Sequence, residues 1–208
     1  MTPPDTLRPE ALRDEIAFIR TLAEEGHKPS NDGGLILVTA GLGWGAASVV
    51  QAGAMAGALP AWTQLAWWVP MPLFIAALVH AARQRKQKPS GQSPLSRAMN
   101  NAWTGMGCAM GAIIASLIVT SIATNSGAHW MLMPPVFLAL YGAGWTLYAV
   151  LSQQKWVMAV AVSCFVAAPL TALLAANPVA SMLAYAVGLV LLVAAPGFIM
   201  MSAGRPSE

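Results

Sequence analysis

The sequence predicts an all-helical, polytopic membrane protein: a bundle of six transmembrane helices preceded by a cytoplasmic amphipathic helix. Of its 208 residues, 57% are hydrophobic and only 9% are charged, with a mean hydropathy of +0.60. Six apolar segments each approach or exceed the roughly 20 helical residues that cross a bilayer core. Lys and Arg are confined to alternate loops between them. This composition excludes an ordinary soluble domain.

The six predicted spans divide the chain into three parts. A cytoplasmic segment, residues 1–32, precedes a membrane domain over residues 33–202, and residues 203–208 form a cytoplasmic tail. The spans are expected at about residues 34–57, 61–82, 99–122, 129–151, 156–176 and 179–201.

Loop charge predicts the orientation of these spans. The second loop, residues 83–97, is the densest block of positive charge, and the fourth loop and the tail are also basic. The other three loops have no Lys or Arg. Short loops rich in these residues stay on the cytoplasmic side, so both termini are predicted to lie in the cytoplasm. The expected location is the inner, or plasma, membrane of a bacterial-type cell.

The first 32 residues contain seven of the eight acids and four bases, a net charge of −3. Residues 8–25 have the spacing of an amphipathic helix, with Leu12, Ile16 and Ile19 on its apolar stripe. Its acidic polar face suits anionic lipid poorly. We therefore expect this stripe to bind protein: either the basic loop of the same chain, or a cytoplasmic or membrane partner. The predicted partner-binding residues are Leu12, Ile16, Ile19, Arg83, Arg85, Lys86 and Lys88.

Glycines four residues apart indicate faces where helices approach closely. Such pairs occur in the first span and again in the third. We expect these two spans to be tightly packed, with each other as one option. The predicted packing residues are Gly41, Gly45, Gly53, Gly57, Gly107 and Gly111.

No Asp, Glu, Lys or Arg lies inside a predicted span, which counts against proton-coupled antiporters, pumps and membrane proteases. His80 and His129 lie at opposite membrane faces, so no metal or cofactor site is expected. Cys108 and Cys164 are interpreted as small hydrophobes. The basic loop has no aromatic interleaving, so nucleic acid is not an expected partner.

Two functions remain open from the sequence. The first is a non-enzymatic membrane protein that interacts or regulates through its cytoplasmic helix and basic loop. The alternative is a transporter or channel for a neutral or weakly polar small molecule. In that case kinked spans would enclose a pocket lined by Trp44, Gln51, Gln64, Asn101, Tyr141 and Trp145.

Overall fold

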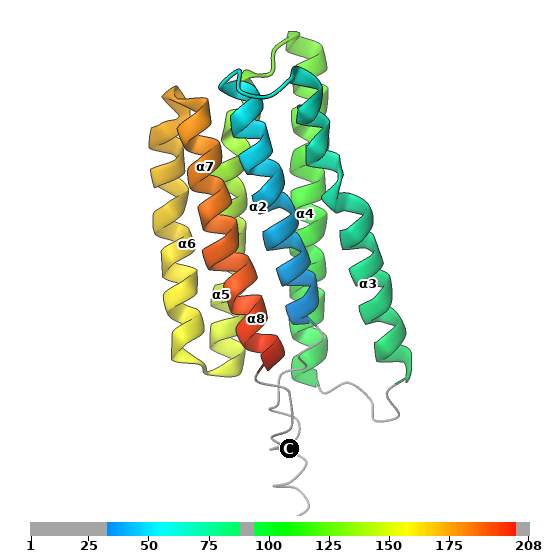
Figure 1. Ribbon diagram of the computed structural model, residues 1–208. Helices are drawn as coiled ribbons and strands as arrows, with labels where there is room; N and C mark the ends of the chain where they lie inside the picture. Colours follow the sequence, from blue (N-terminus) through cyan, green and yellow to red (C-terminus); the bar gives the residue numbers. More distant parts are fainter. Residues whose placement is uncertain (1–32, 88–93, 203–208) are drawn as a thin grey trace, which may run out of the picture.

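A computed structural model describes residues 33–87 and 94–202 of the chain. Every regular element in these two ranges is helical. The helix predicted over residues 8–25 and the tail at 203–208 lie outside them, so the cytoplasmic amphipathic helix stays a prediction. Figure 1 shows the helices standing side by side along one common direction.

The elements follow one another with short connections. In chain order they are α2 (Gly34–Met55), η2 (Ala61–Trp68), α3 (Pro70–Gln87), α4 (Pro94–Thr124), η3 (Ala128–Leu132), α5 (Met133–Ser152), α6 (Lys155–Leu173), η4 (Leu174–Ala176), α7 (Pro178–Leu189), the π-helical η5 (Val190–Ala194) and α8 (Ala195–Ser202).

Six helical stretches are long and apolar enough to cross a membrane, as the sequence predicted. They are Gly34–Met55, Ala61–Gln84, Arg97–Thr124, Ala128–Ser152, Lys155–Ala176 and Pro178–Ser202. With 22 to 28 residues each, they extend about 33–42 Å at 1.5 Å per residue, enough for a hydrocarbon core of about 30 Å. Six helices of this length and composition are the architecture expected of a multi-pass membrane protein.

Prolines mark where several spans start or change helix type. Pro70 begins α3, and Pro134 and Pro135 lie in the first turn of α5. A first turn has no intrahelical partner for its N–H groups, so proline is tolerated there. Pro196 instead lies within the last span, directly after the π-helical turn η5. A π-turn inside a helix changes its direction and its hydrogen-bond register.

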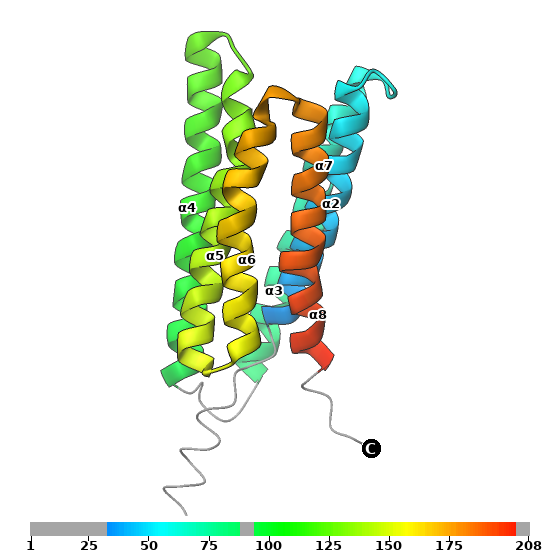
Figure 2. The same ribbon diagram turned by 90° about the vertical axis from the view of Figure 1, so that its left-hand side faces the viewer.

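The helices form two groups. The first helix group contains α2, α3, α7 and α8, in which α2 packs on each of the other three. The second helix group contains α4, α5 and α6, with α5 at its centre. The groups meet where α7 contacts α5 and α6 (Figure 2). Although α3 and α4 are consecutive, they have no extended interface with each other.

The closest helix approach lies between the first and the last span. A Cβ atom added at Gly41 would be 2.6 Å from the Ala194 nitrogen and 2.8 Å from the Leu189 carbonyl oxygen. At Gly45 it would be 3.3 Å from Cγ2 of Val190. The backbone of α2 therefore lies directly against α7 and η5, which only glycine allows at Gly41.

The other predicted packing glycines have different surroundings. Gly53 lies over the Leu59 side chain, and Gly57 has a φ of +72° in the loop that follows α2. Gly107 and Gly111 instead have no atom within 4 Å of an added Cβ. They are exposed on α4, and the third span does not pack its glycine face on the first. Glycine spacing cannot distinguish a helix contact from a face that borders open space or lipid.

The substitution Gly41→Ala tests the close approach. We expect it to destabilise the fold by about 1–3 kcal/mol, the usual range for overpacking, because the atoms it meets are backbone and Cβ atoms that cannot rotate away. The measurement is the apparent melting temperature of the detergent-solubilised protein. The matched control is Gly105→Ala on α4, which meets nothing within 4 Å. Helix propensity predicts that the control is neutral or stabilising by up to about 1 kcal/mol. Equal melting temperatures for the two variants would contradict the packing described here.

Candidate functional site

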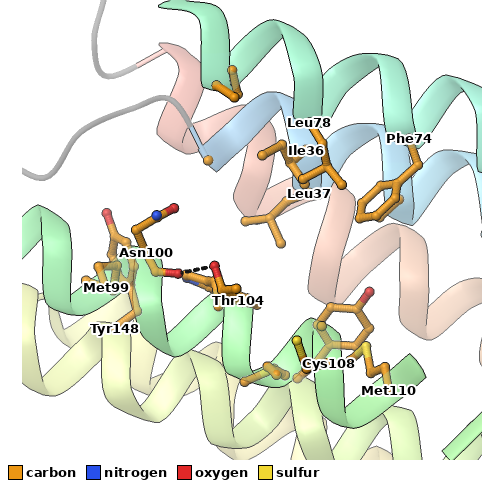
Figure 3. A pocket seen from close by; sticks show the side chains of 18 of the residues that line it. Ile36, Leu37, Phe74, Leu78, Met99, Asn100, Thr104, Cys108, Met110 and Tyr148 are labelled. Atoms are coloured by element: carbon orange, nitrogen blue, oxygen red, sulfur yellow. Dashed lines mark hydrogen bonds between the residues drawn. The ribbon is translucent and has the colours of Figure 1, made fainter. Parts of the chain in front are cut away.

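A cavity of about 610 Å³ lies between the two helix groups. This volume falls within the range of about 300–1,000 Å³ that is common for small-molecule sites. Five helices supply its walls, as Figure 3 shows in close-up. The lining residues are Gly33, Ile36, Leu37, Ala40, Phe74, Leu78, Ala81, Ala82, Met99, Asn100, Trp103, Thr104, Met106, Gly107, Cys108, Met110, Tyr141, Tyr148 and Met200.

The cavity begins at one end of the bundle and ends near its middle. We call this end, where Arg83, Arg97 and Lys155 are exposed, the basic end. The first residue of the described chain, Gly33, and Met200 near its last are both in the cavity wall at this end. On α4 the lining extends over twelve residues from Met99 to Met110, which is roughly 17 Å of helix.

The cavity exists because α4 directs its large side chains toward α5. Trp103 packs edge-on against Trp145, with ring centroids 5.4 Å apart. Met106 occupies the space next to Gly144, where a side chain would clash with it. The neighbouring face of α4 carries smaller residues, among them Thr104 and Gly107, and the space in front of them is open.

The polar groups of the cavity are few: Asn100, Thr104 and Tyr148 lie toward the basic end, and Tyr141 lies two helical turns deeper than Tyr148 on α5. Figure 3 shows Asn100 and Tyr148 together at one end, and Phe74 and Met110 at the other. The Thr104 hydroxyl donates a hydrogen bond to the Asn100 carbonyl oxygen at 2.8 Å. Within residues 33–87 and 94–202, the Tyr148 hydroxyl forms no hydrogen bond, although this side chain is only 3% exposed. The ring of Tyr148 is buried, whereas its hydroxyl borders the cavity, where it can bond to a ligand.

The chemistry of the lining is that of a binding site. None of its members is an acid, a base or a histidine. The described residues also include no group of three or more His, Cys, Asp or Glu side chains placed to hold a metal ion. The arrangement suits an apolar or weakly polar molecule held by contact and a small number of hydrogen bonds.

Two hydrogen bonds join the helix groups: the Ser181 hydroxyl of α7 donates to the Thr171 carbonyl of α6 at 3.3 Å, and Trp145 of α5 donates to Leu192 of the last span. Pro196 has no N–H and cannot donate to the carbonyl four residues earlier, that of Leu192. The indole N–H of Trp145 donates to this oxygen instead, at 2.9 Å. Trp145 is fully buried. A side chain of α5 therefore satisfies a carbonyl that proline leaves open in the last span.

Most of the residues that were predicted to line a pocket lie outside the cavity. Only Tyr141 is in the lining of the cavity. Trp44 packs behind it, edge-on to Phe74 at 5.2 Å between centroids, and Trp145 lies in the core. The three amides, Gln51, Gln64 and Asn101, lie outside the lining.

The predicted partner-binding residues lie mostly beyond what the structure describes. Leu12, Ile16, Ile19 and Lys88 fall outside the described residues, as do the side chains of Arg85 and Lys86 in α3. Arg83 is exposed beside a shallower depression that Ile75 and His80 also line.

The residues that sequence reasoning did not select form a regular pattern on α4. Asn100, Thr104, Gly107 and Cys108 recur at spacings of one to four residues and occupy one face of this helix. A face of small and polar residues in the third span was visible in the sequence. It was interpreted as helix packing at Gly107 and as a small hydrophobe at Cys108, because periodicity does not show whether a face is covered.

The substitution Trp145→Phe tests the hydrogen bond from Trp145 to Leu192. It removes the indole donor and leaves the Leu192 carbonyl buried without a partner, which we expect to reduce stability by about 1–3 kcal/mol. The apparent melting temperature in detergent is the measurement. The control is Trp156→Phe, whose indole donates to Oε1 of Gln154 only two residues away, at the basic end. If both variants melted at the wild-type temperature, the bond would have no structural role.

Comparisons with known proteins do not assign this chain to a family. No protein-family model, no curated protein and no solved structure matches the chain. Its function is therefore argued from the cavity and from the distribution of charge.

Proposed function

We propose that this protein is a non-enzymatic carrier that binds a neutral or weakly polar small molecule in the cavity between its two helix groups. The observation that supports this proposal is a cavity of about 610 Å³ that begins at the basic end and is lined by no residue of the loops at the other end. A binding site that is accessible from one side is the form that an alternating-access carrier has in one of its two states.

The composition of the lining favours an uncharged ligand. A charged group buried near the middle of a membrane needs a partner charge, and the lining has none. The polar residues that it does have, such as Asn100 and Tyr148, can form hydrogen bonds with neutral groups. Loop charge places the basic end on the cytoplasmic side in this proposal, so the cavity lies in the cytoplasmic half of the bundle.

The arrangement of the helices supports movement between two states. The first and second helix groups are each internally packed, and they meet mainly through α7 with α5 and α6. Carriers commonly alternate by rocking one helix group against another around a fixed site. The contact between α5 and η5 through Trp145 and Leu192 lies on this boundary.

A pair of glycine substitutions on α4 tests the cavity. A phenylalanine at Gly107 would project into the open cavity, since an added Cβ meets nothing within 4 Å. We expect Gly107→Phe to fold normally and to lose the bound molecule. Gly111→Phe is the matched control, because Gly111 has equally open surroundings and is not in the lining.

The measurement for this pair is mass spectrometry of small molecules extracted from purified protein. A compound that is enriched with wild type and Gly111→Phe, and at least tenfold depleted with Gly107→Phe, supports the carrier. If no compound differs between the two variants while both remain folded by circular dichroism, the cavity is not a binding site and the proposal fails.

An interaction role is the second candidate, and the distribution of charge favours it. Residues 33–202 contain no acid, whereas residues 1–32 contain seven. The described bases Arg83, Arg97 and Lys155 are exposed at the basic end, where the chain enters α2. The acidic segment joins the described chain at Gly33, and recognition between it and these bases, or of a common partner by both, would use their opposite charges.

Deletion of residues 1–28 tests the interaction role. We expect a stoichiometric partner to co-purify with the tagged full-length chain from native membranes in mild detergent, and to be lost on deletion. Alanine at Leu12, Ile16 and Ile19 should have the same effect, because these residues form the apolar stripe of the predicted helix. Identical sets of co-purified proteins in all three samples would exclude the interaction role.

A further inference from the structure

We infer that the occupant of the cavity is an amphiphile with one long apolar chain and an uncharged, hydrogen-bonding head, and that it enters from the bilayer between α3 and α4. This inference rests on the proposed function and specifies its ligand class. Three independent observations support it: which wall of the cavity is open, how polarity changes along the cavity, and how large the cavity is.

The open wall of the cavity is the side formed by α3 and α4. Lining residues on the other helices are covered, for example Leu37 on α2 at 6% exposed and Met200 on α8 at 5%. On α3, by contrast, the lining residue Leu78 is 41% exposed, and on α4 Thr104 and Cys108 are exposed too. Figure 3 shows α3 and α4 on opposite sides of the space, with these side chains directed into it.

This opening lies at the depth of the membrane. Cys108 is eleven residues beyond Arg97, at the start of the third span, and thus roughly 16 Å from it along α4. An opening at that depth faces hydrocarbon, because the core is about 30 Å thick. The two flanking spans are also the least buried of the six, at 17% and 11% of their most apolar windows. An apolar chain can therefore pass sideways from lipid into the cavity without crossing water.

Polarity changes from one end of the cavity to the other. At the basic end, the Tyr148 hydroxyl borders the cavity and has no partner among the described residues, and Thr104 lies nearby on α4. Deeper in the cavity the lining is mainly apolar, with Phe74 and Met110, and Tyr141 supplies the one hydroxyl at that depth. A ligand that matches this gradient has its polar head at the membrane surface and its chain at the midplane. That is also the orientation of a lipid in the adjacent leaflet.

The size of the cavity indicates a single chain. A volume of about 610 Å³ is that of a site for one drug-sized molecule. A bilayer phospholipid has two long chains and a charged head, and the lining offers no charged group for such a head. Monoacylglycerols and long-chain alcohols share the chemistry that fits: one chain and hydroxyl groups.

Native mass spectrometry of the full-length chain in detergent micelles tests this ligand class. The probes are monoolein, oleate, dioleoylphosphatidylcholine and glycerol, each added at equal concentration. We expect a single monoolein adduct on wild type and at least a tenfold smaller adduct on Gly107→Phe. Tyr148→Phe should weaken monoolein binding about three- to tenfold, the value of one hydrogen bond. The controls Gly111→Phe and Tyr185→Phe should bind like wild type, since neither residue lines the cavity.

The outcomes separate this inference from the proposed function. The compound extracted from wild-type protein and depleted by Gly107→Phe could lack an apolar chain, or glycerol alone could bind at the site. Either result would support the proposed carrier function and contradict the inference that its ligand is an amphiphile. If oleate binds more tightly than monoolein and Gly107→Phe weakens this binding, the uncharged head is wrong. If the phospholipid behaves in this way, the single chain is wrong. Monoolein binding equally to wild type and Gly107→Phe would overturn the inference as well. If no extracted compound responds to Gly107→Phe, the proposed function itself fails.

Discussion

Hydrogen bonding of the backbone in a medium without water is the constraint on which this structure depends. Each unpaired carbonyl inside a bilayer is unfavourable by several kcal/mol, yet Pro196 leaves the Leu192 carbonyl without its usual donor. The Trp145 indole supplies that donor from another span. The same tryptophan packs edge-on with Trp103 and Tyr148. Through these contacts the last span, α5 and the wall of the cavity are held in one arrangement.

Glycine has opposite effects in two of the helices. It allows close backbone contact in α2, and it borders open space in α4. Gly41 on α2 lies against the backbone of η5, and this brings the first and last spans into close contact. Gly107 on α4 faces nothing, and this helps to leave room for a ligand. Trp103 and Met106 pack against α5 on the adjacent face of α4, and the smaller residues beside them border the cavity.

The number and the apolar character of the spans could be predicted from the sequence, because length and hydropathy alone decide whether a helix can cross a membrane. The site could be predicted only in part. Tyr141 was predicted to line a pocket and does line the cavity. Asn101 was predicted as well, but the residue that lines the cavity is its neighbour Asn100. One residue is 100° of helix rotation, and nothing in an apolar span reveals which side faces a neighbour. The π-helical turn was equally hidden, since its residues, Val190–Ala194, continue the apolar run of the last span.

The pairing of the first span with the last has a consequence for biosynthesis. The main packing partners of α2 are α7 and α8, which begin more than 120 residues after α2 ends at Met55. At about 5–20 residues per second, a ribosome needs on the order of ten seconds to make that stretch. During this time the glycine face around Gly41 has no helix to lie against and is in contact with lipid or with the insertion machinery. The first helix group can therefore assemble only when synthesis of the chain is nearly complete, after α4, α5 and α6 have already been able to associate.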